Sequence, residues 1–231
     1  MKTALAMNLA QLHAMQNKAP VVVFSKEMPN EAVGTRMLSS ESRVTMEKMK
    51  DANKRLDTND WNKIAISVAQ LGEQKIHMFD NTSMNVSYIR KKSKQIKRLY
   101  PNEHMLIVID YLQLIDSENT RIPKNEQVAE ISRELKRIAR DLDCTVLALA
   151  QLNRNVEQRQ DKRPMSSDLG ESGSIERDAD VIMAIYRDDY YNKESNEPGV
   201  TELIVTKNRN GETGVAKLQF MKAISKFVDK P

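Results

Sequence analysis

Short, continuous apolar runs are the feature of this sequence that most restricts its fold. Four of them stand out, at residues 20–24, 105–109, 144–149 and 181–185. Runs of this length that are apolar throughout are typical of strands covered on both faces, as in a parallel sheet. Because amphipathic stretches separate them, the sequence predicts an α/β architecture with a mostly parallel central sheet flanked by helices.

Two of the other stretches have the periodicity of a helix. Residues 128–142 place an apolar residue at every third or fourth position, which predicts a helix with one apolar face, and residues 2 to about 16 show the same pattern. The last part of the chain differs. Residues 201–207 and 214–221 are rich in β-forming residues around Asn210-Gly211, which predicts a C-terminal β-hairpin appended to the sheet.

The amino-acid composition limits the classes of protein to which this chain can belong. The 231 residues suit one large domain, and 36 basic against 32 acidic residues give a net charge of +4, which permits a nucleic-acid partner without establishing one. The single cysteine, Cys144, excludes an internal disulfide framework and a multi-cysteine zinc site. No apolar run approaches the roughly 20 residues needed to span a bilayer, so a cytoplasmic location without membrane contact is expected. The three histidines are scattered singly and indicate no metal or catalytic triad.

Two polar stretches are predicted to be loops, at 117–125 and 155–174. The first contains Pro123 and carries Arg121 and Lys124; the second is long, charged and interrupted by proline and glycine. Loops of that length within a compact domain are usually functional or mobile.

The start of the chain contains a possible phosphate site. Lys2-Thr3 at the start of a helix looks like the end of the phosphate-binding loop G-x-x-x-x-G-K-[ST], in which the lysine meets phosphates and the hydroxyl binds Mg²⁺. Asp110 ends an apolar strand, where carboxylates bind Mg²⁺ in open α/β sheets. Each of these residues also has an interpretation without a functional role, because Lys-Thr pairs are common and aspartate often starts a turn.

Four further residues are candidates for catalysis. Glu27 follows an apolar strand and is placed to orient or deprotonate a water, although a solvated loop acid is equally consistent. Gln151 follows another strand and could sense a γ-phosphate, or it could be a structural amide. Lys207 and Arg209 near the hairpin tip could reach the phosphate of a neighbouring subunit, or they could be a charged edge that discourages aggregation.

Taken together, these segments resemble the RecA-like C-terminal motor domain of bacterial and phage replicative DNA helicases of the DnaB type, a group of P-loop NTPases. The resemblance covers essentially the whole chain. It rests on residues 2–6 (KTALA), 24–28 (FSKEM), 108–114 (VIDYLQL), 150–154 (AQLNR), 156–164 (VEQRQDKRP), 171–176 (ESGSIE), 178–180 (DAD), 186–191 (YRDDYY) and 207–211 (KNRNG).

This resemblance implies a hexameric ring that uses ATP and Mg²⁺ to move 5′ to 3′ along single-stranded DNA and to displace the other strand, with primase and a helicase loader as further partners. The residues that match family roles are the phosphate-binding Lys2; Thr3 and Asp110 on Mg²⁺; the catalytic Glu27; the γ-phosphate-sensing Gln151; the trans-acting pair Lys207 and Arg209; and Arg121, Lys124, Glu171 and Gly173 in segments that face DNA.

Two departures from the family pattern are expected to matter. Residues 1–231 are interpreted as one helicase C-terminal domain that lacks its first strand and the Gly-rich part of the phosphate loop, which predicts weak or absent ATP turnover. In addition, Gly170 stands where close relatives carry an arginine, which predicts weaker DNA contact in that loop.

Two alternatives to a helicase motor stay open at this point. The chain could be a catalytically impaired remnant that joins helicase rings or acts as a decoy subunit, or it could be another RecA-type ATPase such as a recombinase. The segments from Gln151 to Tyr191 favour the helicase over the recombinase.

Overall fold

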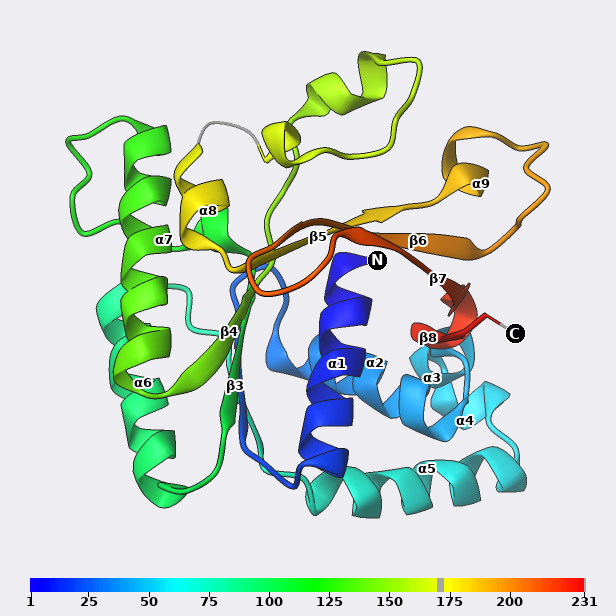
Figure 1. Cartoon of the computed structure of the whole chain (residues 1–231). Coiled ribbons are helices and arrows are strands. Elements are labelled where there is room, and N and C mark those ends of the chain that lie inside the picture. The colour runs from blue at the N-terminus through cyan, green and yellow to red at the C-terminus, as the bar shows by residue number, and fades with distance from the viewer. Residues whose placement is uncertain (170–172, 231) are drawn as a thin grey trace.

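The structure, a computed structural model, describes residues 1–169 and 173–230 (Figure 1). Four parallel strands form the first sheet in the order β2-β1-β3-β4. They are β1 (Val21–Ser25), β2 (Ile76–Phe79), β3 (Met105–Asp110) and β4 (Cys144–Ala148). Both β1 and β3 are buried at every position, as their continuous apolar sequences predict.

Helices cover both faces of this sheet (Figure 1). Alternate residues of β1 and β3 face opposite ways, so Val21 and Val23 pack on one side and Val22 and Phe24 on the other. The first side is covered by α1 (Lys2–Gln16) and α2 (Asn30–Ser42), and the second by α6 (Val86–Leu99) and α7 (Lys124–Asp141). The predicted helices at residues 2–16 and 128–142 are thereby confirmed.

Three further helices lie at the periphery: α3 (Met46–Lys50), α4 (Ala52–Arg55) and α5 (Thr58–Gly72). The side chain of Asp57 caps α5 by accepting a hydrogen bond from the backbone N–H of Asp60 at 2.8 Å. The helix packs on α2 and exposes about half of the surface of Trp61.

A second sheet is antiparallel and has the order β5-β6-β7-β8. It consists of β5 (Val181–Tyr186), β6 (Val200–Asn208), β7 (Gly214–Met221) and β8 (Lys226–Asp229). The predicted C-terminal hairpin is β6–β7. The run at 181–185 does form a strand, but its placement in a parallel sheet was wrong, because β5 pairs only with the antiparallel β6 among the described residues. Asn8 of α1 ties this sheet to the first layer by accepting a hydrogen bond from the N–H of Phe227 at 2.7 Å.

The connecting segments contain short helical turns. These are η1 (Leu112–Leu114), η2 (Arg154–Gln158), η3 (Ser166–Asp168), α8 (Gly173–Asp178), α9 (Asp188–Tyr191) and η4 (Lys222–Ile224). The predicted loop at 117–125 is shorter than expected, because α7 already begins at Lys124. Within the described part of the chain, no helix has both the length and the apolar character that crossing a membrane requires.

Candidate active site

Three parallel strands end side by side at one edge of the first sheet. Ser25 at the end of β1 is in register with Asp110 at the end of β3, and the N–H of Lys26 donates to the carbonyl of Asp110 at 3.0 Å. On the other side of β3, the N–H of Leu149 donates to the carbonyl of Ile109 at 2.9 Å. Glu27, Asp110 and Gln151 therefore follow neighbouring strands at the carboxyl edge, where open α/β sheets bind their ligands.

The first turn of α1 lies at the same edge. The ammonium group of Lys2 donates to the carbonyl of Ala150 at 2.9 Å and lies 5.6 Å from the centre of the Tyr111 ring. The hydroxyl of Thr3 lies close enough to the carboxylate of Asp110 to lower the pKa of that group. The structure thus brings together the lysine, the hydroxyl and the acid that the sequence singled out at widely separated positions.

Asp110 is a buried carboxyl group that is only 3% exposed. Burial raises the pKa of Asp110 above its usual value, the neighbouring hydroxyl of Thr3 opposes this shift, and the nearby charge of Glu27 adds to it. Its Oδ2 atom has no hydrogen-bond partner among the described residues. A buried, unpaired carboxylate oxygen next to a hydroxyl fits the oxygen ligands that Mg²⁺ prefers.

The charge of Lys2 is balanced by two acids at this edge. Partial burial of its ammonium group lowers the pKa of Lys2, whereas the carboxylates of Asp110 and Glu27 raise it. Glu27 itself is exposed. The lysine and Glu27 are therefore near enough to interact electrostatically, with Glu27 open to solvent.

Gln113 is a residue of this site to which no role was assigned from the sequence. Its side-chain amide donates to the carbonyl of Gln151 at 3.2 Å and accepts from the N–H of Gln151 at 3.2 Å. Gln113 thus fixes the backbone of Gln151 while leaving the Gln151 side chain exposed. The one signal for this contact in the sequence is the position of Gln113 three residues after Asp110.

A hollow of about 620 Å³ adjoins Lys2 and Gln151. Its lining includes Tyr186, Tyr190 and Tyr191, of which Tyr190 is 70% exposed. Flat aromatic surfaces next to a cationic group provide both stacking and charge contacts for a ligand.

Lys207 and Arg209 lie at the opposite end of the second sheet from this hollow. Lys207 is in register with Ile182 at the start of β5, whereas Tyr186 ends that strand. The ammonium of Lys207 donates to the carbonyl of Glu176, and the guanidinium of Arg209 contacts the carbonyl of Arg177 at 3.1 Å and the carboxylate of Asp180 at 3.2 Å. Arg209 keeps about half of its side-chain surface exposed. The structure does not bring this pair to the Lys2 site of the same chain.

The residues expected to face DNA lie around α7 and α8. Arg121 and Lys124 are exposed beside the first turn of α7. Gly173 begins α8, which packs on α7. Glu171 and Gly170 lie outside the described residues.

The comparisons with known proteins decide the family. Residues 1–229 match the family described as the DnaB-like helicase C terminal domain. The chain belongs to this family.

Its DnaB-like relatives match along nearly the whole chain. The chain is 44% identical to the replicative DNA helicase DnaC of Bacillus subtilis, and the match covers 99% of this chain and 50% of that relative. It is 45% identical to the replicative DNA helicase DnaB of Haemophilus influenzae, and the match covers 98% of this chain and 48% of that relative. The chain therefore spans about half the length of these curated relatives.

Solved structures of related proteins have the same fold. A DnaB-like replicative helicase, solved in a study of its interactions with primase, matches with a TM-score of 0.96 at 40% identity, covering all of this chain and 55% of that one. A solved ATPase domain also gives a TM-score of 0.96, at 39% identity, covering 99% of this chain and 80% of that one. A KaiC-like protein of Pyrococcus horikoshii, at 16% identity and a TM-score of 0.62, shares the fold alone. The RecA-like fold class predicted from the sequence is thereby confirmed.

Proposed function

We propose that this chain is the motor domain of an ATP-dependent replicative DNA helicase. The observation that carries the proposal is the convergence of Lys2, Thr3 and the buried Asp110 at the carboxyl edge of the sheet, in a chain of the DnaB-like family. These are the residue types with which P-loop enzymes hold a nucleotide and its metal. Neither the decoy subunit nor the recombinase is favoured by any observation on this structure.

Each residue at this edge has one proposed role. Lys2 binds the β- and γ-phosphates of ATP by charge, while the hydroxyl of Thr3 and the carboxylate of Asp110 hold Mg²⁺. Bound Mg²⁺ neutralises charge on the phosphates. Glu27, which is exposed beside them, orients and deprotonates the attacking water. Gln151, whose backbone Gln113 fixes, contacts the γ-phosphate and reports its loss.

The remaining candidates act between subunits or on DNA. Lys207 and Arg209 lie far along the second sheet from their own Lys2, so we assign them to the γ-phosphate bound by a neighbouring copy in a hexameric ring. Arg121 and Lys124 contact the phosphates of single-stranded DNA through their side chains, and Glu171 and Gly173 do so through backbone N–H groups, in both cases without reading the bases. Movement is 5′ to 3′, and primase and a helicase loader are the proposed protein partners.

Nucleotide binding and hydrolysis by this chain test the proposal in two steps. A fluorescent ATP analogue with Mg²⁺ is titrated into the wild type, Lys2→Ala and the exposed control Lys222→Ala. Hydrolysis with single-stranded DNA and displacement of a strand from a forked duplex are then measured on the same proteins.

We expect Lys2→Ala to weaken binding at least about tenfold, because one charge-assisted phosphate contact is lost. Lys222→Ala should match the wild type. Equal binding by Lys2→Ala and the wild type would show that the edge is not a nucleotide site.

A further inference from the structure

The turn that carries Glu27 is fixed by the residues beside it. The hydroxyl of Ser25 donates to the carbonyl of Met28 at 2.7 Å and closes the turn, and the N–H of Lys26 donates to the carbonyl of Asp110 at 3.0 Å. Glu27 itself is exposed. The direction of its carboxylate therefore depends on how firmly this turn is held.

The side chain of Lys26 leads from this turn to another segment of the chain. Its ammonium group lies 2.5 Å from Oδ1 of Asp116, and its side chain is only 17% exposed. A covered charge is costly unless it is paired. Among the described residues, Asp116 is the only acid within ion-pair distance of Lys26, so the position of the lysine depends on that carboxylate.

Asp116 is a fixed point for this ion pair. Its N–H donates to the carbonyl of Met84 at 2.8 Å, and its Oδ2 atom accepts from the N–H of Met84 at 2.9 Å. Met84 is fully buried. The backbone of a core residue thus holds the carboxylate in place, with its other oxygen directed to Lys26.

Asp116 also marks the start of the mostly exposed 117–124 segment, which contains Arg121 and ends at Lys124 in the first turn of α7. Partial burial by itself raises the pKa of Asp116, but hydrogen bonds from Lys26 and the N–H of Met84, with the charges of Lys26 and Lys124, outweigh burial and lower that pKa. One acid is therefore shared by two lysines, one beside Glu27 and one in the segment expected to face DNA.

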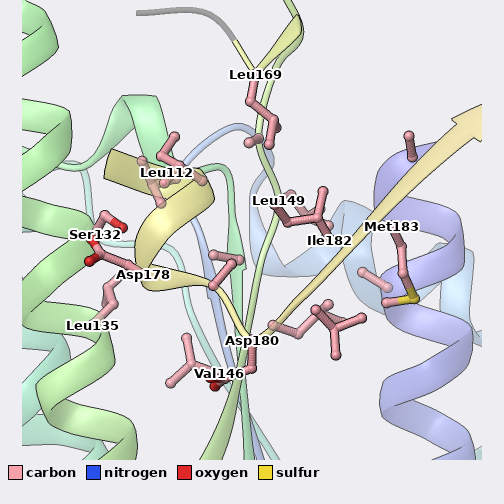
Figure 2. Close-up of a pocket in the computed structure, with 18 of the residues that line it drawn as sticks. Leu112, Ser132, Leu135, Val146, Leu149, Leu169, Asp178, Asp180, Ile182 and Met183 are labelled. Carbon is pink, nitrogen blue, oxygen red and sulfur yellow. Dashed lines mark hydrogen bonds between the residues drawn. The ribbon is translucent and has the colours of Figure 1, made fainter. Parts of the chain in front are cut away.

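The body of α7 is held in place, so a ligand at its first turn acts by charge rather than by moving the helix. Val128 and Ile131 are buried, and the hydroxyl of Ser132 donates to the carboxylate of Asp178 on α8 at 2.7 Å (Figure 2). Only the side chain of Lys124 needs to turn for a phosphate to bind it.

We propose that Lys26 is a positioning residue that steadies Glu27 when DNA is bound. A DNA phosphate that binds Lys124 draws its ammonium group away from Asp116 and leaves the carboxylate to Lys26 alone. The firmer ion pair holds the turn, so that Glu27 is aligned with the attacking water more of the time. This inference rests on the proposed roles of Glu27 and the 117–124 segment.

Amide hydrogen exchange of residues 25–30, read by mass spectrometry with and without a labelled oligothymidine, tests the inference and requires no ATP turnover. The proteins are the full chain, Lys26→Met, the conservative Lys26→Arg and the control Lys75→Met. Lys75 forms a comparable ion pair with Glu103 at 2.6 Å, before β2 and so at the opposite edge of the sheet. Fluorescence anisotropy measures DNA binding by each protein.

We expect DNA to slow exchange in 25–30 about threefold in the wild type, Lys26→Arg and Lys75→Met, in line with the strength of one ion pair near the surface. Lys26→Met should bind DNA with the same affinity and show no slowing. Equal slowing in Lys26→Met, or DNA binding by the wild type without any slowing, would overturn this inference alone. A wild type that does not bind DNA would overturn the proposed function as well.

A second variant examines the shared acid without DNA. Lys124→Met removes the competing charge permanently, so it should slow exchange in 25–30 in the same direction as DNA does. In the Lys26→Met background it should have no effect, because Asp116 then has no lysine to hold. An equal effect of Lys124→Met in both backgrounds would contradict the role of Lys26.

Discussion

At the scale of single residues, Asp110 shows how a functional group is held at a cost to the fold. Its carboxyl group is buried, its Oδ2 atom lacks a partner among the described residues, and burial raises its pKa. Since the unfolded chain titrates near the ordinary value of 3.8, the folded protein loses stability as the pH rises from that value through the raised pKa. Above the raised pKa the destabilisation is fully present.

Asp110→Asn is therefore expected to raise the free energy of unfolding at pH 7 and to abolish Mg²⁺-dependent nucleotide binding. The amide keeps an acceptor for Thr3 but carries no charge into the buried position. Urea unfolding without nucleotide measures the effect, and the advantage over the wild type should shrink as the pH falls through the raised pKa toward 3.8 and vanish below it. The exposed Asp229→Asn serves as control. A variant that is less stable than the wild type at pH 7 would contradict this account of the site.

At the scale of elements, an ion pair between an arginine and a glutamate holds the segment from η2 to η3 on the second sheet. Arg163 donates to both carboxylate oxygens of Glu202 on β6 at 2.8 Å, and its guanidinium lies 4.7 Å from the centre of the Tyr186 ring. The side chain of Glu202 is only 12% exposed. Within the segment, Arg159 bonds Asp168 at 2.7 Å.

Arg163→Met is expected to lower the free energy of unfolding by about 1–3 kcal/mol, because it leaves the Glu202 carboxylate desolvated and without its two donors. The double variant Arg163→Met with Glu202→Met should recover most of the loss, since an apolar pair replaces the ion pair. Urea unfolding of the three proteins checks both statements. A double variant less stable than the single one would show that the ion pair itself stabilises the segment, and that the loss in the single variant does not come from leaving Glu202 without a partner.

The sequence predicted elements well where one physical signal dominated. Continuous apolar runs located β1, β3, β4 and β5, and three-four spacing located α7. It did not predict the sheet to which β5 belongs, because a strand lining an apolar groove has the same composition as one inside a parallel sheet. The short β2 and β8 also went unpredicted; each has only four residues, too few for a periodic signal.

The sequence also grouped residues into a candidate site. Lys2, Thr3, Glu27, Asp110 and Gln151 were grouped as one candidate site because residues that follow parallel strands, or begin the helix beside them, meet at one edge, and their roles stay predictions. Gln113 received no role, since its contact is with the backbone of Gln151, and no side-chain pattern reveals such a partner.

At the scale of the whole molecule, the separation of Arg209 from its own Lys2 predicts activity shared between subunits. Arg209→Ala and Lys2→Ala should each lower DNA-stimulated ATP hydrolysis, weak as it is expected to be in the wild-type chain, when pure. Mixed together they should regain a fraction of it, because a Lys2→Ala subunit supplies its intact Arg209 to the site of an Arg209→Ala neighbour. Steady-state phosphate release measures the recovery.

A mixture as inactive as its components would mean that Arg209 serves its own chain, for instance through its contacts with Asp180 and the carbonyl of Arg177. Mixing either variant with Lys222→Ala controls for dilution of subunits.

The divided sheet also has a mechanical consequence. Among the described residues the two sheets share no ladder of backbone hydrogen bonds, so a force applied to the hairpin reaches the nucleotide edge through contacts between the layers, such as the hydrogen bond from the N–H of Phe227 to Asn8 of α1. Movement of the hairpin relative to the phosphate edge therefore strains side-chain contacts and single hydrogen bonds before it disturbs the backbone ladder of either sheet.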